Sequence, residues 1–184
     1  MMRLLPALLL AALAAAANAA PPASVKASYD VFKDGMHVAV VQETFEKNGA
    51  KYQIVSESNP AGVVALFVRT RIKALSSGAV TRTGLRPDHF DYGRLDDASK
   101  NVSATFDWKA AQLRLTFDGR NETIALPQDT QDRVSLMYQF MFLPAGKLGS
   151  LEFHMTNGKK IEPYRYQLAG SETIDTPLGK FHTL

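Results

Sequence analysis

Apolar and polar residues alternate one by one along many short segments of the chain. In one such segment Val102, Ala104 and Phe106 fall on one side, while Ser103 and Thr105 fall on the other. A period of two is typical of a β-strand with one buried face and one face in water. The pattern predicts strands near 26–33, 36–47, 51–58, 67–76, 79–83, 87–94, 101–108, 111–118, 120–126, 149–156, 160–169 and 171–175.

Dipeptides that favour tight turns stand between several of these segments. They are Asp34-Gly35, Asn48-Gly49, Asp118-Gly119 and Asn157-Gly158. Glycine and its polar neighbour readily adopt the positive φ angles that two-residue hairpin turns require. The alternation and the turns together predict a series of antiparallel hairpins.

Two segments break the alternation. Residues 59–67 indicate a turn or a short helical step between strands. Residues 132–143 are apolar nearly all round a helix, which Thr130 or Asp132 can cap and Pro144 ends. Such a helix must be covered on most sides or must face a cavity. We therefore predict a mainly β fold: a strongly curved antiparallel sheet or an open barrel with one apolar helix packed against it.

The start of the chain has the parts of a secretory signal. An arginine near the N-terminus is followed by an apolar run over residues 4–17 and by the small-residue cleavage site Ala17-Asn18-Ala19. The alternative is a membrane anchor, but this run is shorter than the roughly 20 apolar residues that span a bilayer. We predict a cleaved signal peptide over 1–19 and a single β-rich domain over 20–184, exported to the periplasm as a soluble protein without an integral membrane span.

Composition narrows the chemistry that the chain can carry. Its 184 residues contain no cysteine, which excludes disulfides, thiol nucleophiles and a lipid anchor on an N-terminal cysteine. The formal net charge of +3 is too small and too dispersed to indicate a nucleic-acid binder. We therefore expect no nucleic-acid partner and no lipidation.

No catalytic or metal-binding motif stands out. The four histidines lie far apart, and the nearest approach to a ligand cluster, Asp88-His89 with Asp91, is better explained as an exposed polar strand edge. Phosphate-binding glycine loops and nucleophile elbows are absent from the sequence. We assign no catalytic residue, no metal and no cofactor, and we favour a protein that is not an enzyme. A hydrolase whose site is assembled from distant strands stays open as an alternative.

A row of basic residues is the first candidate binding feature. Arg69, Arg71 and Lys73 fall on one face of the strand predicted at 67–76. Such a row can bind an anionic head group or a membrane surface. A solvated edge strand whose charges oppose aggregation explains the same pattern, so both interpretations stay open.

The predicted helix is the second candidate feature. It is rich in flexible and aromatic apolar side chains, which suit an irregular apolar ligand: Met137, Tyr138, Met141 and Phe142. The same side chains also fill protein cores, and core packing is the alternative interpretation.

Several short motifs occur in an order that resembles a known protein family. They are Tyr29-Asp30-Val31, Gly84-Leu85-Arg86-Pro87, Phe106-Asp107-Trp108, Leu126-Pro127 with Thr130-Gln131-Asp132, and Thr176-Pro177-Leu178-Gly179-Lys180-Phe181. In this order they resemble an uncharacterised family of exported proteobacterial proteins that is known only as a domain of unknown function. The resemblance implies a secreted, mostly β fold and brings no catalytic residues. Members of that family continue with further strands, so either Leu184 is a natural end or the domain lacks its C-terminal strands.

Two functions fit these features. The first is a non-catalytic binding or carrier module that holds an apolar or amphiphilic ligand, such as a lipid, in a curved β-sheet. The second is a structural or interaction protein of the bacterial envelope, which binds a partner protein through an exposed sheet edge.

Overall fold

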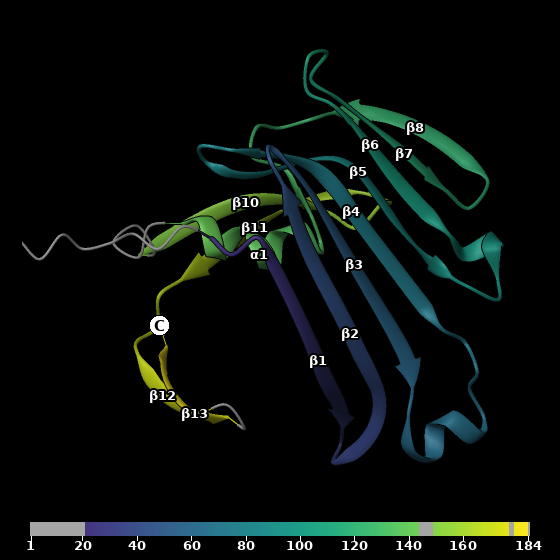
Figure 1. Cartoon of the computed structure of the whole chain (residues 1–184). Coiled ribbons are helices and arrows are strands. Elements are labelled where there is room, and N and C mark those ends of the chain that lie inside the picture. Colours follow the sequence, from purple (N-terminus) through teal and green to yellow (C-terminus); the bar gives the residue numbers. More distant parts are fainter. Residues whose placement is uncertain (1–20, 144–148, 177–178, 184) are drawn as a thin grey trace, which may run out of the picture.

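Antiparallel hairpins build most of the chain, as the alternation predicts. The structure, a computed structural model, describes residues 21–143, 149–176 and 179–183; the predicted signal peptide and Pro144 lie outside the described residues. Eight consecutive strands form one antiparallel sheet in simple sequence order (Figure 1). They are β1 (Ser24–Lys33), β2 (Met36–Asn48), β3 (Lys51–Pro60), β4 (Ile72–Thr81), β5 (Gly84–Arg94), β6 (Val102–Asp107), β7 (Gln112–Phe117) and β8 (Arg120–Ala125).

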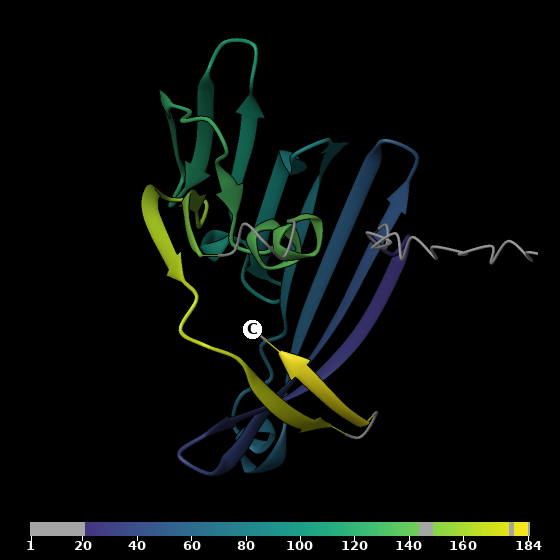
Figure 2. The same ribbon diagram turned by 90° about the vertical axis from the view of Figure 1, so that its left-hand side faces the viewer.

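The remaining elements follow the sheet in the sequence. In Figure 2 the helical segment lies in front of one face of the sheet, and the last hairpin lies lower down, apart from it. A second sheet contains β11, β10 and β9, in which β10 pairs antiparallel with β11 and parallel with β9. The bounds are β9 (Gln131–Asp132), α1 (Ser135–Gln139), η3 (Phe140–Phe142), β10 (Ser150–Thr156), β11 (Ile161–Gln167) and the hairpin β12 (Glu172–Thr176) and β13 (Gly179–Thr183).

The core lies between the eight-stranded sheet and the segment that contains α1. We call the sheet face toward α1 the inner face and the opposite one the outer face. Fully buried apolar side chains of the inner face form the core with the helical segment; they include Phe45, Ile54, Phe90, Leu113 and Leu115. The ring of Tyr138 in α1 stacks on that of Phe45 in β2, with centroids 5.4 Å apart. This burial of apolar surface is the main force that holds the helix to the sheet.

Several element predictions were wrong in detail. The helix predicted at 132–143 is one short α-helical turn that continues as the 3-10 turn η3. By contrast, the turn or short helical step predicted at 59–67 is confirmed by the 3-10 helix η1 (Gly62–Leu66). The two strands predicted at 67–76 and 79–83 are one strand, β4, with a register shift at Ser77/Gly78. Strands β9 and β13 were not predicted; β9 is too short to show a period of two.

The mainly β, antiparallel character of the fold is confirmed. Among the described strands the sheet does not close into a barrel, because β1 and β8 stand at its two ends and each pairs with one neighbour only. Within the described ranges no helix has the length and apolar character needed to cross a membrane.

Candidate functional site

The helix candidates do not gather in one open site. Tyr138 is buried on Phe45 and donates a hydrogen bond from its hydroxyl to Glu43 Oε2, 3.1 Å away. Burial, together with the Glu43 carboxylate, raises the pKa of Tyr138. Met141 and Phe142 pack against the core. These contacts are those of core residues, and ligand binding by them stays a prediction.

Met137 differs from the other three because its side chain is 62% exposed. It lines a small groove of about 290 Å³ between α1 and the inner face, together with Tyr92 and Arg133. The Arg133 guanidinium lies over the Tyr92 ring, 4.9 Å from its centroid. This groove is at the lower limit of the volumes that small-molecule sites have.

The predicted basic row is wrong as a strand feature. Arg69 and Arg71 lie in the loop before β4, which begins only at Ile72. Lys73 does lie on β4, where its ammonium group is 2.7 Å from Glu57 Oε1 on β3. The hydrogen bond from Lys73, with a smaller effect of Arg71, holds the pKa of Glu57 below its ordinary value. The three residues therefore do not share one face of a strand, and binding of an anionic group by them stays a prediction.

A larger hollow lies between the β5–β6 loop, which contains η2 (Ala98–Lys100), and the β7–β8 turn. Its volume is about 900 Å³, within the range of small-molecule sites, and we call it the η2 hollow. Apolar lining comes partly from Leu75 and Leu95, of which Leu95 is 57% exposed. Basic residues also line it: Lys73, Arg94 and Lys100. An apolar surface beside cationic side chains suits an amphiphile with an anionic end.

The β5–β6 loop is fixed by its own hydrogen bonds. Asn101 Oδ1 accepts from the backbone N–H of Arg94, 3.1 Å away, and a Cβ at Gly93 would collide with the Asn101 amide. Asp97 caps η2 by accepting from the backbone N–H and the hydroxyl of Ser99. These bonds, led by that of the Ser99 hydroxyl, lower the pKa of Asp97. These hydrogen bonds fix this wall of the η2 hollow.

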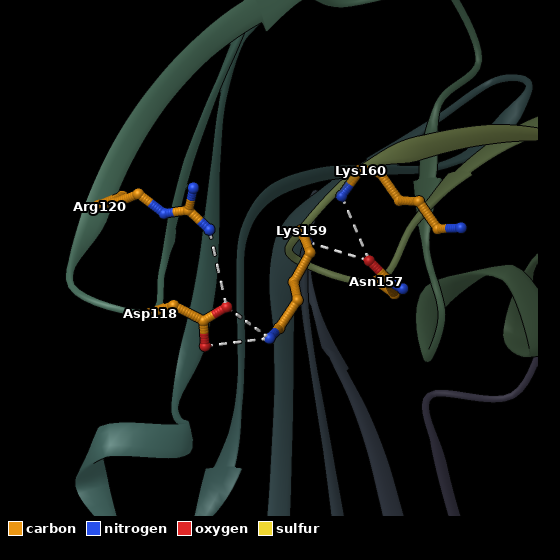
Figure 3. A network of polar contacts seen from close by, with 5 residues as sticks. All are labelled: Asp118, Arg120, Asn157, Lys159 and Lys160. Carbon is orange, nitrogen blue, oxygen red and sulfur yellow. Dashed lines mark hydrogen bonds and ion pairs between the residues drawn. The ribbon is translucent and has the colours of Figure 1, made fainter.

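The opposite wall is tied to the second sheet by the network in Figure 3. Lys159 Nζ lies 3.1 Å from Asp118 Oδ2, while Arg120 Nη2 lies 4.0 Å from the same oxygen. Asn157 Oδ1 accepts from the backbone N–H groups of Lys159 and Lys160 at 3.0 and 3.3 Å. The network joins the β7–β8 turn to the β10–β11 turn, which lie 41 residues apart at Asp118 and Lys159.

Among the described residues, some charged side chains around the η2 hollow have an ion-pair or hydrogen-bond partner and others have no ion pair. Asp118 forms an ion pair with Lys159, and Asp91 forms a hydrogen bond with His89. Arg94 and Lys100 have no ion pair within 4.0 Å in the part of the chain that the structure describes. These two cations are therefore available to an anionic group in the hollow.

The predicted polar cluster at Asp88 and His89 is half-buried, and it lies on a central strand rather than at an edge. His89 Nε2 lies 2.8 Å from Asp91 Oδ2, and its Nδ1 lies 3.4 Å from Thr105 Oγ1. Asp88 instead pairs with Lys51 at 3.1 Å. A 3.4 Å contact is longer than a nucleophile and its base require. Among the described residues no three metal-ligating side chains come together.

Sequence reasoning missed a buried polar cluster under α1. Ser76, Asp132 and Ser135 are fully buried, and Ser76 Oγ also lies 3.0 Å from the Tyr52 hydroxyl. Asp132 was named as a helix cap, and its Oδ1 does accept from the backbone N–H groups of Val134 and Ser135. Ser76 on β4, which donates a hydrogen bond to the other carboxylate oxygen of Asp132, could not be foreseen from the sequence. The cluster is closed to solvent and serves the packing of α1.

The fold and the η2 hollow define a mainly β protein in which an eight-stranded antiparallel sheet supports a surface cavity between two of its loops. The model of the family described as "Protein of unknown function (DUF3108)" matches residues 25–184, and the chain belongs to this family. The resemblance found in the sequence motifs is thereby confirmed. Comparisons with curated proteins and with solved structures give no match.

Proposed function

We propose that the protein is a non-catalytic binding or carrier module for a small amphiphilic ligand with an anionic end, held in the η2 hollow. The observation that carries the proposal is the hollow itself, about 900 Å³ in volume, with apolar lining beside Lys73, Arg94 and Lys100. An apolar tail would contact Leu75 and Leu95, and its anionic end would pair with Arg94 and Lys100.

The cellular location proposed for this function rests on the sequence. The features of residues 1–19 support export to the periplasm, where a carrier would meet lipids and other amphiphiles. The antiparallel order of the eight strands and the position of α1 on one face support a strongly curved, open sheet.

Titration with a fluorescent long-chain fatty acid tests the binding function. Leu95→Asp places a charge on the apolar lining, and we expect it to weaken binding by about tenfold or more. Leu66→Asp is its matched control, because Leu66 is also an exposed leucine, 74% exposed, in η1. Lys100→Glu should weaken binding similarly, whereas Lys109→Glu, on the exposed β6–β7 turn, should not.

Two results would contradict the binding function. One is equal affinity of all four variants for the fatty acid, which would place any binding outside the η2 hollow. The other is the absence of uptake by the unchanged protein together with ligand-free protein in native mass spectrometry after mild purification.

An envelope interaction protein is the second candidate. The observation that favours it is the free edge of β1, on the side away from β2. This strand of ten residues pairs on one side only within the described structure. Such an edge can accept a further strand from a partner. Crosslinking in cells tests it, and failure to recover the same partner in repeated experiments would overturn it.

A further inference from the structure

The backbone of β1 directs every second residue toward its free edge. The N–H of Lys47 donates to the carbonyl of Ala23 at 2.7 Å, so Ala23 turns its polar groups toward β2. In an antiparallel ladder the direction alternates, and the register Val25↔Phe45 and Ala27↔Glu43 continues that pair. Lys26, Ser28 and Asp30 therefore point their N–H and C=O groups outward.

A second copy of the chain can satisfy these outward groups in few registers. Antiparallel pairing across a two-fold axis must place outward residues opposite outward residues. With Ser28 opposite Ser28, Lys26 of each copy faces Asp30 of the other, which gives two ion pairs. With Lys26 or Asp30 on the axis, like charges face each other instead, which is destabilising. With Ala27 or Tyr29 on the axis, neither Lys26 nor Asp30 faces a residue of opposite charge, so pairing about Ser28 is the register that gains the ion pairs.

The irregularity of β1 favours the same register. A register shift between Val31 and Phe32 ends the regular ladder, so the stretch available for pairing is Ser24–Val31, with Ser28 near its middle. On the inner face, Tyr29 is 51% exposed and Val31 is 37% exposed. Pairing about Ser28 sets Tyr29 opposite Ala27 and Val31 opposite Val25, which covers exposed apolar surface.

We propose that the protein forms a symmetric dimer in which the β1 strands of two copies pair antiparallel about Ser28 and join the two sheets into one. The inference rests on the second candidate function, since it names the partner of the β1 edge as a second copy. It is independent of ligand binding in the η2 hollow.

Charge changes test the register in solution. We expect the full chain to be a dimer in analytical ultracentrifugation, and K26E or D30K to weaken dimerisation by about tenfold or more. The double variant K26E/D30K restores opposite charges and should restore the dimer. K33E, beyond the register shift, is the control and should leave the dimer intact. Asp30 also lies 3.0 Å from His37 Nε2, so K26E is the cleaner single change.

Engineered thiols give an independent test, because the chain has no cysteine of its own. Two Ser28 Cα atoms on the axis would lie about 5.5 Å apart, within reach of a disulfide. Ser28→Cys should therefore give a covalent dimer on mild oxidation. Ser24→Cys should not, since the two thiols would lie about 26 Å apart along the strands.

Three outcomes would overturn the dimer: an unchanged chain that is monomeric over the measurable concentration range, single charge variants that dimerise normally, or a double variant that stays monomeric. If the chain is monomeric but a different protein is crosslinked repeatedly in cells, the edge function stands and the self-pairing falls.

Discussion

Ser76 on β4 donates a 2.6 Å hydrogen bond to Asp132 Oδ2, and both residues are fully buried. The two residues are 56 positions apart in the sequence. Because the other carboxylate oxygen of Asp132 accepts from the N–H groups of Val134 and Ser135, one side chain both starts α1 and fixes it to the sheet. Burial of the Asp132 carboxyl raises its pKa, and the hydrogen bonds from Ser76 and Ser135 act against that effect.

Removing the Asp132 carboxyl should destabilise the protein strongly. Asp132→Ala leaves the Ser76 hydroxyl and two backbone N–H groups without their acceptor, and we expect a loss of about 3 kcal/mol in the free energy of unfolding. Asp132→Asn keeps an oxygen for the N–H groups and offers an N–H to Ser76, so it should cost less than half as much. Urea unfolding at pH 7 measures both, and equal losses would contradict this role of the side chain.

The raised pKa of Asp132 also predicts a pH dependence. The folded state holds the proton of Asp132 more tightly than the unfolded state, so its contribution to stability falls as pH rises from the ordinary carboxyl pKa through the folded value. The unfolding free energy of the unchanged protein, minus that of Asp132→Asn, should therefore decrease as pH rises above about 4. Other carboxyls titrate in both proteins and cancel. A difference that stays constant or increases with pH would show that hydrogen bonding outweighs burial at this site.

The hairpins could be predicted because their information is local. Each strand shows its buried face within a few residues, and the β1–β2, β2–β3, β7–β8 and β10–β11 turns each carry a glycine. The start of β4 could not be predicted, since residues 67–71 also alternate. Ser58, opposite Ile72, is the last β3 residue that pairs with β4 although β3 continues to Pro60, and the pairing with β5 ends at Ile72 opposite Arg94. The regular ladder therefore ends at Ile72 on both sides of β4.

The candidate site was predictable only in part. Lys73 was named from its spacing, but Arg94, Leu95 and Lys100 follow no periodic pattern and line the η2 hollow only because loops meet there. For the helix, the residues could be named from the sequence but their role could not. Its apolar residues were visible in the sequence, yet whether they face a ligand or the core depends on a contact such as Tyr138 on Phe45, which joins residues far apart in the chain.

Two turn glycines allow backbone strain to be separated from collision. Gly158 has φ +88°, and a Cβ there would lie 2.5 Å from Val102 Cγ2; Gly119 has φ +71° and open space around it. Gly119→Ala should cost about 1 kcal/mol for its left-handed backbone alone. Gly158→Ala adds the collision, and we expect about 2–3 kcal/mol in total. Thermal unfolding of both variants measures the difference; similar losses would mean that the β10–β11 turn moves away from β6 freely.

The stack of Tyr138 on Phe45 gives the sharpest test of core packing against ligand binding. Phe45→Ala removes a fully buried ring that also contacts Tyr52 and Phe142, and we expect a loss of about 4 kcal/mol in unfolding free energy. Tyr138→Phe keeps the stack and removes only the hydrogen bond to Glu43, which should cost about 1 kcal/mol.

Because Tyr138 belongs to the core and lies outside the residues that line the η2 hollow, Tyr138→Phe should leave the affinity for the fluorescent fatty acid unchanged. A measurable loss of affinity with unchanged stability would reverse this assignment. It would favour the helix as the ligand site, which was the second candidate feature in the sequence.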